Sequence, residues 1–161
     1  MKKIFLSILA CCFLLSGIAP AFAQAQKEQI VISGGSQASS YAPGKNFTGR
    51  VRVDPAFDTE NPQRVYGAYV TFEPSSRTNW HIHPMGQVLI VTFGTGMTQE
   101  WGKEIQIIKQ GDIVVCPPNV KHWHGAAPNA AMTHLAIGER LEGSSVTWLE
   151  KVSDEEYGAK N

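Results

Sequence analysis

Two histidines lie one residue apart in the stretch HIHPMGQ, residues 81–87, before a Pro-Met-Gly turn and a glutamine. Alternate side chains of a β-strand point to the same face of a sheet, so His81 and His83 are expected to point together. Either histidine alone would most simply be a surface residue or a hydrogen-bonded one. The pair, placed next to a turn, indicates a shared site.

The same spacing recurs further along the chain in KHWH, residues 121–124. His122 and His124 are expected to share one face of a strand, while Trp123 takes the other face. Same-face imidazoles from two separate strands are typical of a metal site inside a β-barrel. Imidazole nitrogen binds Mn, Fe, Co, Ni, Cu and Zn, so the ligand type alone does not choose the metal.

Short β-rich runs recur along the chain between Gly, Pro and Asn breaks. They are QIVIS, RVRV, VYGAYVTF, QVLIVTF, IQII, DIVVC, THLAI and VTWLEKV. Many short strands joined by turns predict an all-β sandwich or barrel. One short helix is expected near the end, because Ser153 and Glu156 in SDEEY have the spacing of a capping box.

HIHPMGQ followed by GDIVVCPPNVKH, residues 111–122, resembles the two motifs of the cupin superfamily, which are small jelly-roll-type β-barrels that hold a metal. The strings GSQAS, VTFEP, RTNWHIHPMGQVLIVT, KHWHGAAP, AMTHLAI and DEEY further resemble the bacterial manganese-dependent hydroxynitrile lyases. The resemblance implies one divalent ion per chain, Mn first, with Fe, Co, Ni or Zn as alternatives. The implied ligands are His81, His83, Gln87 and His122, with Gln87 where most cupins have glutamate.

A glutamine ligand changes the charge of the expected site. Three imidazoles and a carboxylate would leave a divalent ion with a net charge of +1, whereas Gln87 leaves +2. Unit charges about 4 Å apart interact by about 4 kcal/mol at an effective dielectric of about 20. The site is therefore expected to stabilise anionic ligands, which favours Lewis-acid chemistry over oxygenase chemistry. The alternative is that Gln87 only forms a hydrogen bond in the core.

The fifth histidine, His134, shares a strand face with Met132 and Ala136. If that face is interior, a neutral imidazole titrating near the working pH would suit a general base. The resemblance implies that role for His134, and the alternative is a hydrogen bond in the core. His124 is expected either to orient the substrate or simply to pack. Thr78 is a candidate hydroxyl at the mouth of the cavity.

The chain begins with the pattern of a secretory signal peptide. A basic start precedes a short apolar run, and AFA, residues 21–23, supplies the small residues of a cleavage site. We expect residues 1–23 to be removed on export to the periplasm, with a lipoprotein on Cys11 as the alternative. Residues 24–45 are then expected to form an N-terminal arm, and residues 46–161 the single cupin domain.

Charge and cysteine content narrow the classes of partner. The chain has 14 basic and 14 acidic side chains. This balance does not indicate binding to nucleic acid, or to an anionic membrane apart from the crossing of a membrane on export. Cys116 would be the one cysteine left after cleavage, so no intrachain disulfide is expected and the thiol is interpreted as a small buried group. The expected partners are a small-molecule substrate and further copies of the chain, as a dimer or tetramer.

Three functions are compatible with these features. The resemblance implies a carbon–carbon lyase that reversibly cleaves a cyanohydrin of the mandelonitrile type to an aldehyde and HCN, with the metal as Lewis acid and His134 as base. A mononuclear metal-dependent dioxygenase is the second function, and Gln87 argues mildly against it. The third is a non-catalytic exported protein that binds a metal and an acidic small ligand.

Overall fold

A computed structural model describes residues 28–59 and 63–158. The expected signal peptide lies outside the described residues. The chain divides into two compact units, Met1–Val31 and Ile32–Asn161, and all the strands belong to the second. Within the described part of the chain, no helix is long and apolar enough to span a lipid bilayer.

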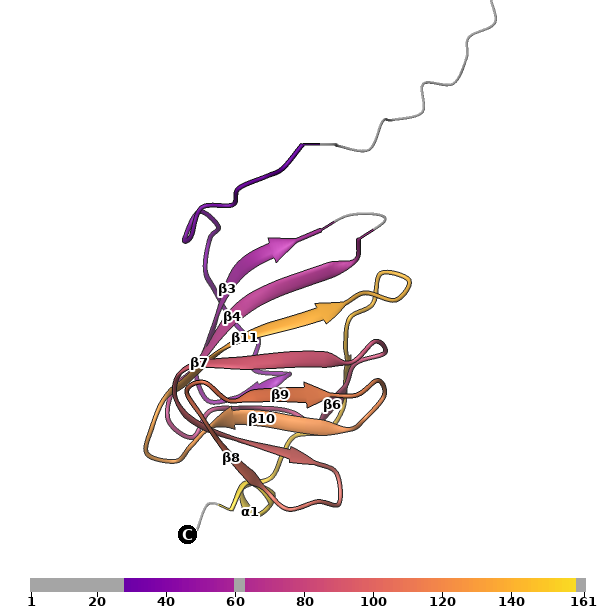
Figure 1. Ribbon diagram of the computed structural model, residues 1–161. Coiled ribbons are helices and arrows are strands. Elements are labelled where there is room, and N and C mark those ends of the chain that lie inside the picture. The colour runs from indigo at the N-terminus through magenta and orange to yellow at the C-terminus, as the bar shows by residue number, and fades with distance from the viewer. Residues whose placement is uncertain (1–27, 60–62, 159–161) are drawn as a thin grey trace, which may run out of the picture. The chain divides into compact units, whose positions relative to one another are not determined.

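The second unit is a curled, nearly all-β sheet with one short C-terminal helix, as the sequence predicts (Figure 1). The elements are β1 Ser40–Tyr41, β2 Phe47–Thr48, β3 Val51–Asp58, β4 Val65–Phe72, β5 Arg77–Thr78, β6 His81–Ile82, β7 Gln87–Glu100, β8 Gln106–Lys109, β9 Ile113–Cys116, β10 His122–Ala126, β11 Met132–Glu139, β12 Thr147–Trp148 and α1 Asp154–Tyr157. The main path of the sheet runs β1-β3-β4-β11-β7-β10-β5-β2, so that strands distant in sequence become neighbours.

The long strand β7 joins the two halves of the sheet. Its first half pairs with β11 and β9, and its second half pairs with β10 and β8. Gly94 lies at the change-over with a φ of 77°, and a Cβ there would be 2.0 Å from the carbonyl oxygen of Ala131. Only glycine tolerates both this backbone conformation and this approach. Gly94 therefore encodes the point at which the strand leaves one half for the other.

Most of the expected strands are present, but two predictions need correction. QIVIS, residues 29–33, forms no strand, and its Ile30, Val31 and Ile32 are exposed. Its β-branched side chains favour an extended backbone. A strand must also form hydrogen bonds with a neighbouring strand, and this segment pairs with none of the described strands. VTWLEKV forms only the two-residue strand β12.

Two buried apolar clusters support the curled sheet. The first contains Val51, Phe72, Val91, Ile108, Ala126 and Met132. The second contains Trp80, Met97, Trp123, Val152 and Tyr157. The expected capping box is confirmed, because the Ser153 hydroxyl accepts from the backbone N–H of Glu156 while the Glu156 side chain accepts from that of Ser153. The helix is thereby positioned so that Tyr157 completes the second cluster.

Candidate metal centre

Three histidines from the two sequence motifs meet in the interior of the curled sheet. Each of His81, His83 and His122 offers one ligand atom, and these atoms lie within 4.8 Å of one another. All three side chains are buried. The register explains the meeting, because His81 on β6 stands directly opposite His122 on β10 in an antiparallel pair. Pairing of these two short strands therefore brings the two motifs together.

Each of the three imidazoles is held through Nδ1 by a backbone carbonyl. A ring nitrogen that donates to a carbonyl carries the proton, so the other nitrogen, Nε2, presents its lone pair. Nε2 of His83 and Nε2 of His122 are buried and have no hydrogen-bond partner among the described residues. The carbonyls belong to Asn79 for His81 (2.9 Å), Ser145 for His83 (2.6 Å) and Val120 for His122 (2.9 Å).

The side chain of Gln87 adds an oxygen to this set. Gln87 begins β7 and is 9% exposed, and its Oε1 is buried with no hydrogen-bond partner among the described residues. Burial lowers the pKa of the neighbouring His83, and the hydrogen bond of that imidazole to the Ser145 carbonyl partly opposes the lowering. Unpartnered imidazole nitrogens beside an amide oxygen fit a divalent transition metal. The residues present therefore suit the ion that the sequence motifs imply.

The remaining two histidines continue the cluster away from the three expected ligands. The ring centroid of His124 lies 5.2 Å from that of His81 and 4.9 Å from that of His134. His134 also packs on Phe72, with ring centroids 5.5 Å apart, and neither of its ring nitrogens has a partner among the described residues. His124 thus lies between His134 and the expected ligands.

Thr78, the candidate hydroxyl at the cavity mouth, lies next to the histidines. Its side chain is buried, and its hydroxyl accepts a hydrogen bond from the backbone N–H of His124 at 3.1 Å. The hydroxyl therefore helps to join β5 to β10 next to the histidines.

Burial keeps the histidine cluster uncharged. Desolvation lowers the pKa of His134 from its usual 6.5 to about 4 and that of His122 likewise to about 4. Burial also lowers the pKa of His81 and that of His124 well below 6.5. Neutral imidazoles are the form that binds a metal or accepts a proton. The expectation that His134 titrates near the working pH differs from the structure, because its strand places the ring in a fully buried position.

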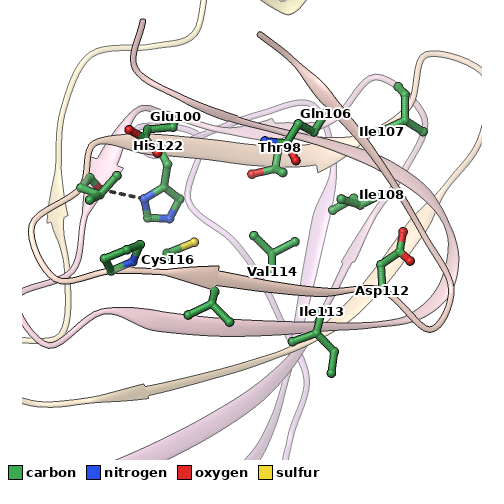
Figure 2. A pocket seen from close by; sticks show the side chains of 13 residues that line it. Thr98, Glu100, Gln106, Ile107, Ile108, Asp112, Ile113, Val114, Cys116 and His122 are labelled. Carbon is green, nitrogen blue, oxygen red and sulfur yellow. Dashed lines mark hydrogen bonds between the residues drawn. The ribbon is translucent and has the colours of Figure 1, made fainter. Parts of the chain in front are cut away.

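A cavity of about 380 Å³ borders the metal centre at His122, which is the one histidine among its lining residues. The rest of its lining comes from β7, β8, β9 and the segment between β9 and β10. Figure 2 shows the side chains of His122, Cys116 and Val114 pointing into it. The volume is in the range of pockets that take small organic molecules. A small molecule therefore fits beside His122.

Comparison with known proteins agrees with this geometry. Residues 68–138 match the cupin domain family. The chain is 57% identical over 123 residues to the (R)-mandelonitrile lyase of Granulicella tundricola, which covers 76% of this chain and 94% of that protein. The chain belongs to the cupin family.

Two solved structures share the architecture. A cupin-like protein of Thermotoga maritima is 45% identical, covers 73% of this cupin and 90% of its own chain, and superposes with a TM-score of 0.70. A predicted oxalate decarboxylase of Thermotoga maritima is 18% identical, with a TM-score of 0.61 over 74% of this cupin and 100% of its own chain. At that identity the second likeness concerns the fold alone.

A segment beyond the matched cupin domain completes the site. The carbonyl of Ser145 holds His83. Trp148 on β12 pairs with His81 and packs against its imidazole, with the ring planes tilted by 42° and the ring centroids 4.9 Å apart. The indole of Trp148 is itself packed on Phe47, at 5.1 Å. Sequence reasoning missed these residues, because a carbonyl has no side-chain signature and Trp148 lies far from both histidine motifs. We call residues 145–148 the C-terminal clasp.

Trp148→Ala is expected to weaken metal binding by this cupin about 10-fold or more. Loss of the indole frees the His81 ring to rotate, and loss of a group that orients a ligand typically costs about 10–100-fold in affinity. Competition with a chelator of known affinity would measure the dissociation constant. Trp148→Phe should restore most of the affinity. Trp101→Ala, which removes an exposed indole outside the histidine cluster, should leave the affinity unchanged. Equal affinities in Trp148→Ala and wild type would show that the clasp does not orient His81.

Proposed function

We propose that this cupin is a metal-dependent hydroxynitrile lyase, which reversibly cleaves a cyanohydrin of the mandelonitrile type to an aldehyde and HCN. The observation that carries the proposal is the 57% identity to an (R)-mandelonitrile lyase across 94% of that protein. The buried cluster of uncharged histidines supports it, and a cavity of suitable size lies beside one of them, His122.

His81, His83, Gln87 and His122 are the residues that would hold the ion. The bound ion supplies Lewis-acid stabilisation of negative charge on the substrate oxygen. Gln87 strengthens that effect because it is neutral, so the ligand set leaves the full charge of the ion uncompensated. The three backbone carbonyls keep the imidazoles in one tautomer and one orientation.

His134 is proposed to move the proton. Its neutral imidazole takes the proton of the cyanohydrin hydroxyl, the carbon–carbon bond breaks with its electron pair leaving on cyanide, and the imidazolium returns the proton to give HCN. His124, which lies between His134 and His81, is proposed to orient the substrate oxygen. A low pKa keeps His134 in the accepting form, and negative charge developing on the neighbouring oxygen stabilises the imidazolium.

The identity of the ion, the location and the assembly belong to the same proposal. We propose Mn²⁺ as the ion, the periplasm as the location after removal of residues 1–23, and a homodimer or homotetramer as the assembly. Metal analysis of protein isolated from a periplasmic extract, with mass determination of its N-terminus and light scattering, would test all three together.

Cyanide release from mandelonitrile tests the proposed reaction. The protein would be stripped of metal, assayed, and assayed again after reloading with Mn²⁺. Release that depends on the metal is the expected result. Stoichiometric metal binding without release above the buffer rate would contradict the lyase proposal and leave a dioxygenase or a ligand-binding cupin, which oxygen uptake would then separate.

A further inference from the structure

Three neighbouring strands of the sheet are apolar on both of their faces. Residues 88–91 of β7, residues 113–115 of β9 and residues 135–137 of β11 are continuous apolar runs. Such runs are typical of strands that are covered on both faces, whereas a strand with one face in water alternates apolar and polar residues. The inner face of the sheet, which carries Leu89 and His134, is buried. The opposite, outer face therefore also has the composition of a covered surface.

The register of the sheet gathers the outer apolar side chains into two adjoining rows. Residues that stand opposite each other in a pair of strands share a face of the sheet, so the pairing gives the rows directly. We call these side chains the outer patch. Its first row crosses β4, β11, β7 and β9 as Tyr69, Leu135, Ile90 and Ile113, and its second row crosses β11, β7 and β9 as Ile137, Val88 and Val115.

The outer patch is open at both ends. Tyr69 is 42% exposed at one end, and Ile113 and Val115 are 62% and 68% exposed at the other. None of these three side chains is covered by another described part of the chain. A contiguous apolar patch left exposed on a soluble protein typically marks an interaction site.

The charged side chains that border the outer patch on β3 and β11 are paired within the chain. Arg52 contacts Asp54 at 2.9 Å beside Tyr69, and Arg64 contacts Glu139 at 3.9 Å beside the second row. Each pair presents both signs of charge, so the border adds no net charge to the patch. In a two-fold contact a surface meets its own copy, and a surface with a net charge would repel itself. A neutral apolar patch has no such penalty, so a second copy of the chain fits it.

The dimensions of the outer patch suit the centre of a contact between two copies. Four neighbouring strands about 4.8 Å apart make it roughly 20 Å wide. A stable interface buries about 800 Å² from each partner and has an apolar centre within a polar rim. Thr71 and Thr133 form the next row on the same face, with their hydroxyls 3.0 Å apart. These threonines and the Arg52–Asp54 pair supply the polar rim.

We propose that the outer patch is the contact between two copies of this chain, which pack sheet against sheet across a two-fold axis. The proposal rests on the proposed assembly into a dimer or tetramer, and it names the surface that forms that assembly. Leu135, in the first row, follows His134 directly on β11. The contact therefore covers the outer side of the strand whose inner side carries the proposed base.

A double variant, Tyr69→Lys with Ile113→Lys, places a charge at each end of the first row, where both side chains are exposed. It is expected to halve the mass of the assembly measured by light scattering, because a two-fold contact brings the new charges of both copies into one interface. The dissociation constant of the contact should rise at least about 100-fold. Ile107→Lys is the matched control, because this isoleucine is 56% exposed but lies on β8, outside the outer patch. It should keep the wild-type mass.

Opposite charges distinguish loss of the contact from loss of the fold. The double variant Tyr69→Glu with Ile113→Glu should also lose the assembly when it is alone. An equal mixture of the lysine and glutamate chains should recover the wild-type mass, with native mass spectrometry showing both chains in each assembly. Folded variants that form no mixed assembly would contradict the proposal.

The mass of the wild-type protein separates failure of the contact from failure of the wider proposals. A wild type with the mass of one chain at every concentration would overturn both the contact and the proposed assembly. Unchanged mass in both double variants would overturn the contact and leave the assembly to another surface. Cyanide release from mandelonitrile is measured on the same wild-type preparation. An assembly that depends on the outer patch, in a protein that releases no cyanide, would support the contact and contradict the lyase function.

Discussion

His134→Ala is expected to lower kcat for cyanide release by about 10²–10⁴-fold while leaving the metal in place. The size follows from the usual contribution of a positioned general base. The metal is retained because His134 is outside the group of histidines whose ligand atoms converge. Cyanide release at saturating mandelonitrile and metal content by mass spectrometry would be measured on the same preparation.

Two comparisons separate a catalytic loss from a structural one. Thr133→Ala changes the neighbouring residue on β11, whose side chain lies on the other face and contacts the Thr71 hydroxyl at 3.0 Å, and it should keep near-wild-type activity. His122→Ala should lose the metal and the activity together. If His134→Ala kept full activity with its metal bound, His134 would not be the base, and His124 would become the next residue to change.

The metal-free protein is expected to lose about 3 kcal/mol of stability between pH 7 and pH 4 through His134 alone. Its pKa is 6.5 when unfolded and about 4 when folded, because burial disfavours the charged ring. As the pH falls below 6.5 the unfolded chain binds a proton that the folded chain does not, so stability present above pH 6.5 declines toward pH 4. A shift of this size corresponds to about 1.4 kcal/mol per pKa unit.

Urea unfolding of the metal-free protein at a series of pH values would measure this loss. His134→Phe, which substitutes a ring that cannot titrate beside Phe72, is expected to show a shallower decline between pH 7 and pH 4. The other buried histidines, whose pKa values burial also lowers, should account for the decline that remains. Identical slopes in the variant and the wild type would mean that His134 is not the group responsible.

The fold could be predicted from the sequence because the patterns that indicate its strands and its helix lie in short stretches of the chain. Alternation in VYGAYVTF and THLAI marked strands with one interior face, and Ser153 with Glu156 marked the start of the helix. The prediction of a strand at QIVIS was wrong, because its residues have the composition of a strand but no neighbouring strand pairs with them. Composition reports what a backbone favours, whereas pairing depends on which partner the rest of the chain provides.

The site was only partly accessible for a related reason. Spacing placed His81 with His83, and His122 with His124, on common faces, and the structure brings His81, His83 and His122 together. Spacing could not show that the His134 ring is fully buried, which sets its pKa, nor that Ser145 and Trp148 hold the first histidine pair. Those features depend on contacts between residues far apart in the sequence. The inward direction of Val114 and Cys116 could have been inferred from alternation along β9.

The C-terminal clasp has a consequence for how the protein is made. All the expected ligands have been synthesised once His122 emerges from the ribosome, but Ser145 and Trp148 follow only near the end of the chain. A nascent or truncated chain that stops before Ser145 contains every ligand and still lacks the carbonyl that fixes His83 and the indole that fixes His81. A chain truncated before Ser145 is therefore expected to bind the ion less tightly than the full-length protein.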